Sequence, residues 1–181
     1  VGVAPRMGWH LVATDHPWLM IMRAAMLAAV SLLFQSALKS LPLAETSALL
    51  FVTPLIVAVL AGPILGEKVR LGAWIAIVAG FGGTLLIARP GGAMTFSGVL
   101  YGLGSALCYA AYQLFTRKLA ETEPPMRQLF YSALVGSIVM SCIVPAYLDG
   151  PRPTLGQGAL IVSLALAATA GHFLFTRAAR E

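Results

Sequence analysis

The chain alternates between long apolar runs and short polar connections. A helix needs about 20 apolar residues to cross a bilayer, and runs of this kind occupy residues 18–38, 43–66, 71–88, 96–116, 128–148 and 156–176. The short connections force each helix to return antiparallel beside the preceding one. Helices and closed barrels satisfy their backbone polar groups in lipid, and these runs lack the alternation of barrel strands. The pattern predicts an all-α polytopic membrane protein with six transmembrane helices.

The composition excludes several classes of protein. Of the 181 residues, 59% are hydrophobic and 10% are charged, against roughly 45–50% and about 25% in soluble domains. Cys108 and Cys142 lie far apart with no Cys/His cluster, so we expect neither a disulfide framework nor a metal site. No nucleophile elbow, HExxH motif or phosphate-binding loop occurs in the sequence, so we expect no enzyme and no cofactor.

The net charge of +5 is explained by membrane orientation. When the flanks of six spans are assigned alternately to two sides, nine of the 12 basic residues fall on one side: Arg6, Arg23, Lys68, Arg70, Arg117, Lys118, Arg127, Arg177 and Arg180. Lys39, Arg89 and Arg152 fall on the other side. Basic residues collect on the cytoplasmic side, which places both ends of this chain in the cytoplasm. No basic run is long enough to follow a nucleic acid backbone, so we expect no nucleic acid partner.

Two features of the helices concern packing. Small residues spaced four apart allow helices to approach closely in lipid, and such stripes occur at Gly98-Gly102-Ala106-Ala110, at Ala76-Gly80-Thr84, and at Ala159-Ser163-Ala167-Gly171. Pro54 lies near the middle of its span and removes a helical hydrogen bond. We therefore expect the helix at 43–66 to be discontinuous, and substrate sites of transporters favour such breaks. A harmless kink is the alternative.

Three charged or titratable residues lie within the spans, where such groups are candidates for function. Arg23 is close to the cytoplasmic boundary, and we expect it to extend to the interface. Glu45 lies in the first turn of its helix, where it either complements the helix dipole or lines a pathway. His172 is inside the last span, where it either carries a proton or donates to a substrate, or else hydrogen-bonds a neighbouring backbone carbonyl.

Polar and aromatic side chains also share helix faces. The run 96–116 carries a face that can stack on and hydrogen-bond a metabolite, made of Tyr101, Ser105, Tyr109, Tyr112 and Gln113. Gln35 with Ser31 forms a weaker face on the first helix. Tyrosines near the helix ends have an alternative role as membrane-interface anchors.

Specific motifs give a family resemblance. The stretch ALKSLPLAE at 37–45, followed by Pro54 and by LGEK at 65–68, resembles the EamA-type module of the drug/metabolite transporter superfamily. That module continues with a Trp-containing helix, a glycine-rich run and a basic-Pro-Gly tail, which match Trp74, residues 80–83 and residues 89–91. The resemblance covers essentially the whole chain and is most specific in 37–91.

The resemblance implies ten helices in two five-helix repeats of opposite orientation. The six spans would then correspond to helices three to eight. Residues 1–92 would form the C-terminal part of the first repeat, and residues 93–181 the N-terminal part of the second. By the same resemblance, Pro54 and Glu67 match the Pro and Glu of the family's fourth helix, with Glu67 at the cytoplasmic mouth.

We therefore expect a transporter of the cell (inner) membrane that moves a small metabolite or drug-like compound by alternating access. Its partners would be the substrate and the lipid bilayer. We leave open whether the protein forms a homodimer. The residues expected to line the pathway are Gln35, Glu45, Pro54, Tyr101, Tyr109, Tyr112, Gln113 and His172. Protonation of Glu45 or His172 would couple transport to a proton gradient. The alternative is a non-transporting membrane scaffold or assembly subunit, which would need no polar cavity.

Overall fold

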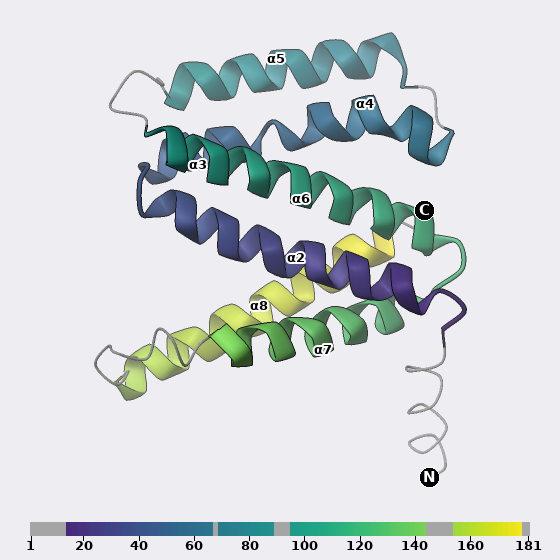
Figure 1. Ribbon diagram of the computed structural model, residues 1–181, viewed down its shortest axis with the longest axis vertical. Coiled ribbons are helices and arrows are strands. Elements are labelled where there is room, and N and C mark those ends of the chain that lie inside the picture. The colour runs from purple at the N-terminus through teal and green to yellow at the C-terminus, as the bar shows by residue number, and fades with distance from the viewer. Residues whose placement is uncertain (1–13, 67–68, 89–94, 144–153, 179–181) are drawn as a thin grey trace. The chain divides into compact units, whose positions relative to one another are not determined.

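The computed structural model describes residues 14–66, 69–88, 95–143 and 154–178, and all regular elements in these ranges are α-helices. They are α2 (Pro17–Leu38), α3 (Leu43–Leu50), α4 (Thr53–Leu65), α5 (Leu71–Ala88), α6 (Phe96–Ala120), α7 (Pro125–Ile143) and α8 (Leu155–Ala178) (Figure 1). Together α3 and α4 occupy one predicted span, so the helices fall on all six predicted ranges. The predicted fold class, an all-α polytopic membrane protein, is confirmed.

Among the described residues, four stretches are long and apolar enough to cross a membrane: Pro17–Leu38, Leu43–Leu65, Pro125–Ile143 and Leu155–Phe175. The apolar part of α5, Leu71–Gly83, is shorter. Helix α6 has 25 residues but is less apolar, because its tyrosines, Gln113 and its basic last turn lower its mean hydropathy. The polar face predicted on this helix therefore distinguishes it from the other spans.

Two predicted helix boundaries were wrong by a few residues. Helix α7 begins at Pro125 rather than at 128, because proline is well suited to the first turn of a helix. Residues 144–148 of that predicted span lie outside the described residues. Helix α6 continues to Ala120, where Arg117 and Lys118 occupy its last turn and complement the negative end of the helix dipole.

The span at 43–66 is interrupted, as its proline predicts. Helix α3 ends at Leu50 and α4 begins at Thr53, with Pro54 in the first turn of α4. Pro54 has no N–H, so it cannot donate to the carbonyl of Leu50. The chain instead closes a tighter turn, in which the N–H of Val52 donates to the Leu49 carbonyl at 3.1 Å. Helix α4 ends at Leu65 and is capped by Gly66, whose φ of 72° lies in the left-handed region.

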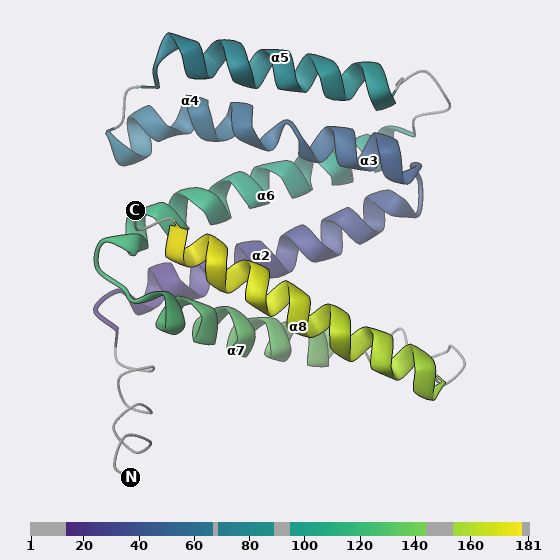
Figure 2. The ribbon, with the colours of Figure 1, turned by 180° about the vertical axis from the view of Figure 1, so that it is seen from behind.

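The described contacts divide the chain into two compact units: residues 25–118, and residues 1–24 together with 119–181. Within the first unit, α6 lies beside α2 and also beside α3 and α4, while α5 packs on α3 and α4 (Figures 1 and 2). The hydroxyl of Ser105 donates to the Val30 carbonyl of α2 at 3.3 Å, and that of Thr53 donates to the Ala106 carbonyl at 3.3 Å. These two bonds connect α6 to its neighbours on either side.

The small-residue stripe of α6 is the packing surface of this unit. Ala106 and Ala110 are fully buried. A Cβ atom added at Gly98 would lie 2.6 Å from Cγ of Leu41, and one at Gly102 would lie 2.5 Å from Cδ1 of Leu49. Only glycine therefore allows α6 to approach α3 and the connection between α2 and α3 so closely. The predicted α6 stripe is confirmed.

The other two predicted stripes do not pack within the described residues. A Cβ added at Gly80 or Gly171 meets nothing within 4 Å, and Ala159 and Ser163 on α8 are exposed. Chains rich in alanine and glycine often show this spacing by chance, so the spacing of these two stripes remains a prediction of packing and no more.

In the second unit, α7 and α8 lie side by side (Figure 2), and Arg23 near the start of α2 joins α7. The expectation that Arg23 extends to the interface is wrong, because its side chain is only 1% exposed. Its Nη1 donates to the backbone carbonyl of Gln128 at 3.0 Å and to Oγ of Ser132 at 2.7 Å. Arg23 is thus a buried connection between helices.

A second polar cluster holds the connection between α6 and α7. The fully buried carboxylate of Glu123 accepts hydrogen bonds from the hydroxyl of Thr14 and from the guanidinium of Arg127. Burial by itself raises the pKa of a carboxyl group, but these two hydrogen bonds and the charge of Arg127 outweigh it and lower the pKa of Glu123 below its usual value. Glu123 is therefore ionised and paired in the folded protein.

This pairing predicts a pH-dependent contribution to stability. Because the folded pKa is depressed, the contribution is complete above the unfolded pKa near 4.5 and is lost as the pH falls through the folded value. We expect Glu123→Gln to lower the unfolding temperature at pH 7, and the difference from wild type to narrow below pH 4.5. Thermal unfolding in detergent at both pH values measures this. The exposed Glu121 supplies the control variant Glu121→Gln, and a difference that stays constant with pH contradicts the prediction.

Candidate functional site at the helix break

A cavity of about 310 Å³ opens where α3 and α4 are interrupted. Its lining comes from both sides of the break and from the facing part of α6, and consists of Ser47, Leu50, Phe51, Thr53, Pro54, Tyr109 and Gln113. A phenol, an amide and two hydroxyls thus meet apolar side chains in one small space. This mixture is typical of sites for small molecules, where a few polar groups orient a ligand against apolar walls.

The local sequence explains why the cavity lies here. The buried hydroxyl of Thr53, which donates to the Ala106 carbonyl, holds the start of α4 against α6. Residues three and seven positions after Ala106 share its helix face, which brings Tyr109 and Gln113 opposite the break. Pro54 leaves the Leu50 carbonyl without its usual helical donor, so a backbone acceptor is also present among the lining residues.

Tyr109 is held in place by a second tyrosine. Its ring stacks on that of Tyr112 with the centroids 6.0 Å apart and an angle of 7° between the planes. Tyr112 is only 1% exposed, whereas Tyr109 is partly exposed and lines the cavity. The buried ring therefore supports the ring that a ligand would contact, and offset aromatic pairs of this kind contribute about 0.5–1.5 kcal/mol beyond their area burial.

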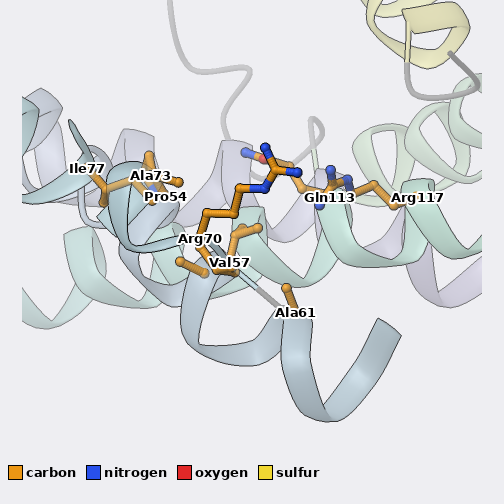
Figure 3. A pocket seen from close by; sticks show the side chains of 10 residues that line it. Pro54, Val57, Ala61, Arg70, Ala73, Ile77, Gln113 and Arg117 are labelled. Atoms are coloured by element: carbon orange, nitrogen blue, oxygen red, sulfur yellow. The ribbon is translucent and has the colours of Figure 1, made fainter. Parts of the chain in front are cut away.

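A larger cavity of about 510 Å³ shares Pro54 and Gln113 with the first. Its remaining lining comes from α4, from α6 and from the start of α5, and consists of Val57, Ala58, Ala61, Val69, Arg70, Ala73, Ile77 and Arg117. Figure 3 shows the polar ends of Arg70, Gln113 and Arg117 pointing toward one another across this space. The two cavities therefore adjoin each other at Pro54 and Gln113, next to the helix break.

Of the residues expected to line a pathway, the structure brings three together around these cavities: Pro54, Tyr109 and Gln113. Tyr112 lies behind Tyr109. The other expected residues of this unit do not line either cavity. Gln35 is exposed, Tyr101 is 41% exposed, and Glu45 is buried in the first turn of α3.

Two further residues that we expected at the site are not among the described lining of these cavities. His172 is half-buried on α8 and belongs to the other compact unit. Glu67, expected at the cytoplasmic mouth, lies outside the described residues. In the part of the chain that the structure describes, no group of three His, Cys, Asp or Glu side chains is placed to hold a metal ion.

Sequence reasoning missed Thr53, Arg70 and Arg117 as site residues. The two arginines entered the charge count but were not assigned to a site, although each is adjacent to a helix end on the same predicted side. A signal was present in their positions, because Arg117 follows Gln113 by four residues and so shares its helix face. Arg70 directly precedes α5, and no pattern in the sequence indicates what it faces.

Comparison with known proteins identifies a family and several relatives. The EamA-like transporter family matches residues 5–89 and again residues 96–181. An S-adenosylmethionine uptake transporter of Rickettsia bellii is 26% identical over 94% of this chain and 58% of its own length. A riboflavin transporter of Rhizobium johnstonii is 29% identical over 66% of this chain and 40% of its own length.

A riboflavin transporter of Vibrio cholerae is 31% identical over 52% of this chain and 32% of its own length. The chain thus spans about half the length of the curated relatives that it matches. No solved structure shows a significant match. The two family matches meet between residues 89 and 96, whereas the compact units divide the chain within α2 and α6.

Proposed function

We propose that this chain, which belongs to the EamA-like transporter family, forms part of an integral membrane transporter of a small metabolite or drug-like compound. Relatives whose names describe uptake or transport support this proposal. The observation that carries it is the interrupted helix at Pro54, which faces Tyr109 and Gln113 across a cavity. A scaffold protein would have no need for polar and aromatic groups gathered at a break within a span.

The cavity at the break supplies the contacts that a metabolite needs. A flat ring of the substrate stacks on Tyr109, the amide of Gln113 donates and accepts hydrogen bonds, and the Leu50 carbonyl accepts one. S-Adenosylmethionine and riboflavin, which name the relatives, both contain a flat heteroaromatic ring with hydrogen-bonding groups. We therefore propose that the substrate also contains a flat heteroaromatic ring with hydrogen-bonding groups.

Alternating access is the mechanism we propose. The turn at Phe51–Val52 joins two short helices that lack a continuous ladder of hydrogen bonds, so α4 can tilt relative to α3 with little loss of bonding. Transporters place substrate sites at such discontinuous helices, between repeats that rock against each other. In this account residues 1–92 belong to the first repeat and residues 93–181 to the second.

We also propose an orientation in the cytoplasmic (inner) membrane. Nine of the 12 basic residues fall on one side of the predicted spans, and this excess marks the cytoplasmic side. Both ends of the chain would therefore be cytoplasmic. The cavity that contains Arg70 and Arg117 would then open toward the cytoplasm.

Uptake into vesicles tests the proposed function together with its coupling. We expect vesicles that contain the full-length protein to accumulate radiolabelled riboflavin or S-adenosylmethionine, and more so with a proton gradient imposed. Glu45→Gln or His172→Gln should reduce the pH dependence of uptake, because these titratable groups lie inside spans. Glu121→Gln is the control. Unchanged pH dependence in both variants would exclude coupling through these groups, and no uptake of any tested metabolite would contradict transport.

A further inference from the structure

We propose that Gln113 determines specificity at the smaller cavity, because its amide selects substrates that carry a hydrogen-bond donor and a hydrogen-bond acceptor side by side on one edge of a flat ring. Lactams, imides and amino-substituted nitrogen heterocycles have such an edge. The inference rests on the proposed function and deepens it, since it states how the polar groups of the ring must be arranged. It concerns the unit of residues 25–118 alone, because every lining residue of this cavity belongs to that unit.

The first observation is that most polar side chains of this cavity are uncommitted. The hydroxyl of Thr53 donates to the Ala106 carbonyl and so serves the packing of the helices. The other three polar lining groups make no hydrogen bond to any group that the structure describes, and they are the hydroxyl of Ser47, the phenol of Tyr109 and the amide of Gln113. Polar groups away from bulk water are normally paired, so these three are available to an occupant of the cavity.

Other polar side chains within the spans are used by the fold itself. Thr46 directly precedes Ser47, and its hydroxyl donates to the backbone carbonyl four residues earlier at 3.1 Å. Gln128 is a fully buried glutamine of α7, and its Nε2 donates to the Glu123 carbonyl at 3.3 Å. Gln113 is half-buried, faces a cavity and makes no such bond to a described group. Its amide is therefore not explained by packing.

The second observation is the row that Tyr109 and Gln113 form on α6. Residues four apart in a helix share a face, with their Cβ atoms about 5–6 Å apart, and both of these side chains line the smaller cavity. The buried ring of Tyr112 covers one face of the Tyr109 ring, with the centroids 6.0 Å apart. A substrate ring therefore stacks on the opposite face, where it lies beside Gln113 and turns one edge toward the amide.

The chemistry of a carboxamide determines what that edge must carry. An amide holds an acceptor oxygen and a donor nitrogen at a fixed spacing, so it forms two parallel hydrogen bonds with an edge that presents a donor beside an acceptor. The same bidentate pairing lets glutamine distinguish the edge of one base from another by about tenfold or more. A hydroxyl such as that of Ser47 rotates to donate or to accept, and so it does not read this arrangement.

The remaining lining suits a flat ring. Its apolar residues are Leu50, Phe51 and Pro54, and the volume is about 310 Å³. This is near the lower end of the range of roughly 300–1,000 Å³ for pockets that hold small molecules. The larger cavity adjoins at Pro54 and Gln113, and the polar end of Gln113 points into that space (Figure 3). The edge of the ring that Gln113 contacts therefore lies where the two cavities meet.

Two isomeric probes test the proposal, because 2-quinolinone and 4-quinolinone are both flat, uncharged and identical in composition. The N–H and C=O groups lie side by side in 2-quinolinone and on opposite sides of the ring in 4-quinolinone. We would measure both by equilibrium dialysis with the full-length protein in phosphatidylcholine nanodiscs, after subtracting binding to empty nanodiscs. We expect 2-quinolinone to bind about tenfold more tightly, the effect of a bidentate pair against a single hydrogen bond.

Three variants assign this preference to one side chain. Gln113→Met keeps an unbranched side chain of similar length without the amide, and it should bind the two isomers equally. Gln35→Met is the matched control, because Gln35 is exposed on α2 and lines neither cavity, and it should retain the preference. Ser47→Ala should weaken the binding of both isomers alike, because a rotating hydroxyl serves either one. The readout is the ratio of two affinities, and a distorted cavity lowers both affinities together.

Equal binding of the isomers to the wild type overturns the proposal, as does the absence of binding of either isomer. A Gln113→Met variant that keeps the preference also overturns it. Uptake in vesicles separates this inference from the proposed function. Uptake of a metabolite together with equal binding of the isomers refutes the selection by Gln113 and leaves transport intact. A preference that Gln113→Met abolishes, without uptake of any tested metabolite, refutes transport and leaves the selection intact.

Discussion

Replacing Arg23 with alanine is expected to destabilise the protein by about 3 kcal/mol. Two effects act in the same direction. The change removes a side chain that is only 1% exposed, and large-to-small core substitutions cost about 2–5 kcal/mol. It also removes the two hydrogen bonds to the Gln128 carbonyl and to Ser132, although relief of the buried charge offsets part of that loss. Unfolding in mixed micelles as denaturing detergent is added measures the difference.

Arg23→Met separates the two effects, because it keeps most of the volume and removes the hydrogen bonds. We expect this variant to recover part of the loss, leaving a destabilisation of about 1 kcal/mol. The exposed Lys118 supplies the control, and Lys118→Ala should change stability by less than about 0.5 kcal/mol. If Arg23→Ala is as mild as Lys118→Ala, Arg23 is not the buried connection described here.

The second large effect is expected at Gly102. In Gly102→Ala the new Cβ would lie 2.5 Å from Cδ1 and 3.1 Å from Cβ of Leu49, so Leu49 or the helix must move. Overpacking of this kind costs about 1–3 kcal/mol, and Gly102→Val should cost more. The same unfolding measurement in mixed micelles detects it.

Gly104 is the matched control, because it lies two residues away on the same helix. A Cβ added there meets Cδ1 of Leu33 at 3.5 Å, an ordinary contact. We expect Gly104→Ala to be neutral or stabilising by up to about 1 kcal/mol, since alanine favours the helix over glycine. Equal effects of alanine at the two positions would contradict the close approach of α6 and α3.

Much of the fold could be predicted from the sequence because lipid imposes strong constraints. The apolar runs fixed the positions of the helices, and Pro54 predicted the interruption in 43–66 because proline cannot donate a backbone hydrogen bond. The burial of Arg23 could not be predicted in this way. Its distance from the span boundary suggested the interface, but burial depends on which helix face meets α7, and spacing within one helix does not contain that information.

The candidate site was predicted only in part for the same reason. Pro54, Tyr109 and Gln113 were identified because each is unusual within an apolar span. Arg70 and Arg117 were treated as topological charges, since their convergence depends on the packing of α5 and α6 with α4. Residues that are exceptional in their own helix can be recognised from sequence, whereas residues made important by a neighbouring helix need the structure.

We infer that a substrate pathway passes the helix break at Gln113. Its most direct test uses a single cysteine at this position, in a background with Cys108→Ser and Cys142→Ser. A water-soluble methanethiosulfonate reagent is applied to vesicles that contain the full-length protein, and uptake is measured before and after. Tyr101→Cys, on the same helix but outside the cavities, is the control.

We expect the reagent to modify Gln113→Cys and to abolish uptake. The transported metabolite should slow this modification, and uptake by Tyr101→Cys should be unaffected. Complete modification of Gln113→Cys with full uptake, or a cysteine at 113 that the reagent does not reach, would contradict this pathway.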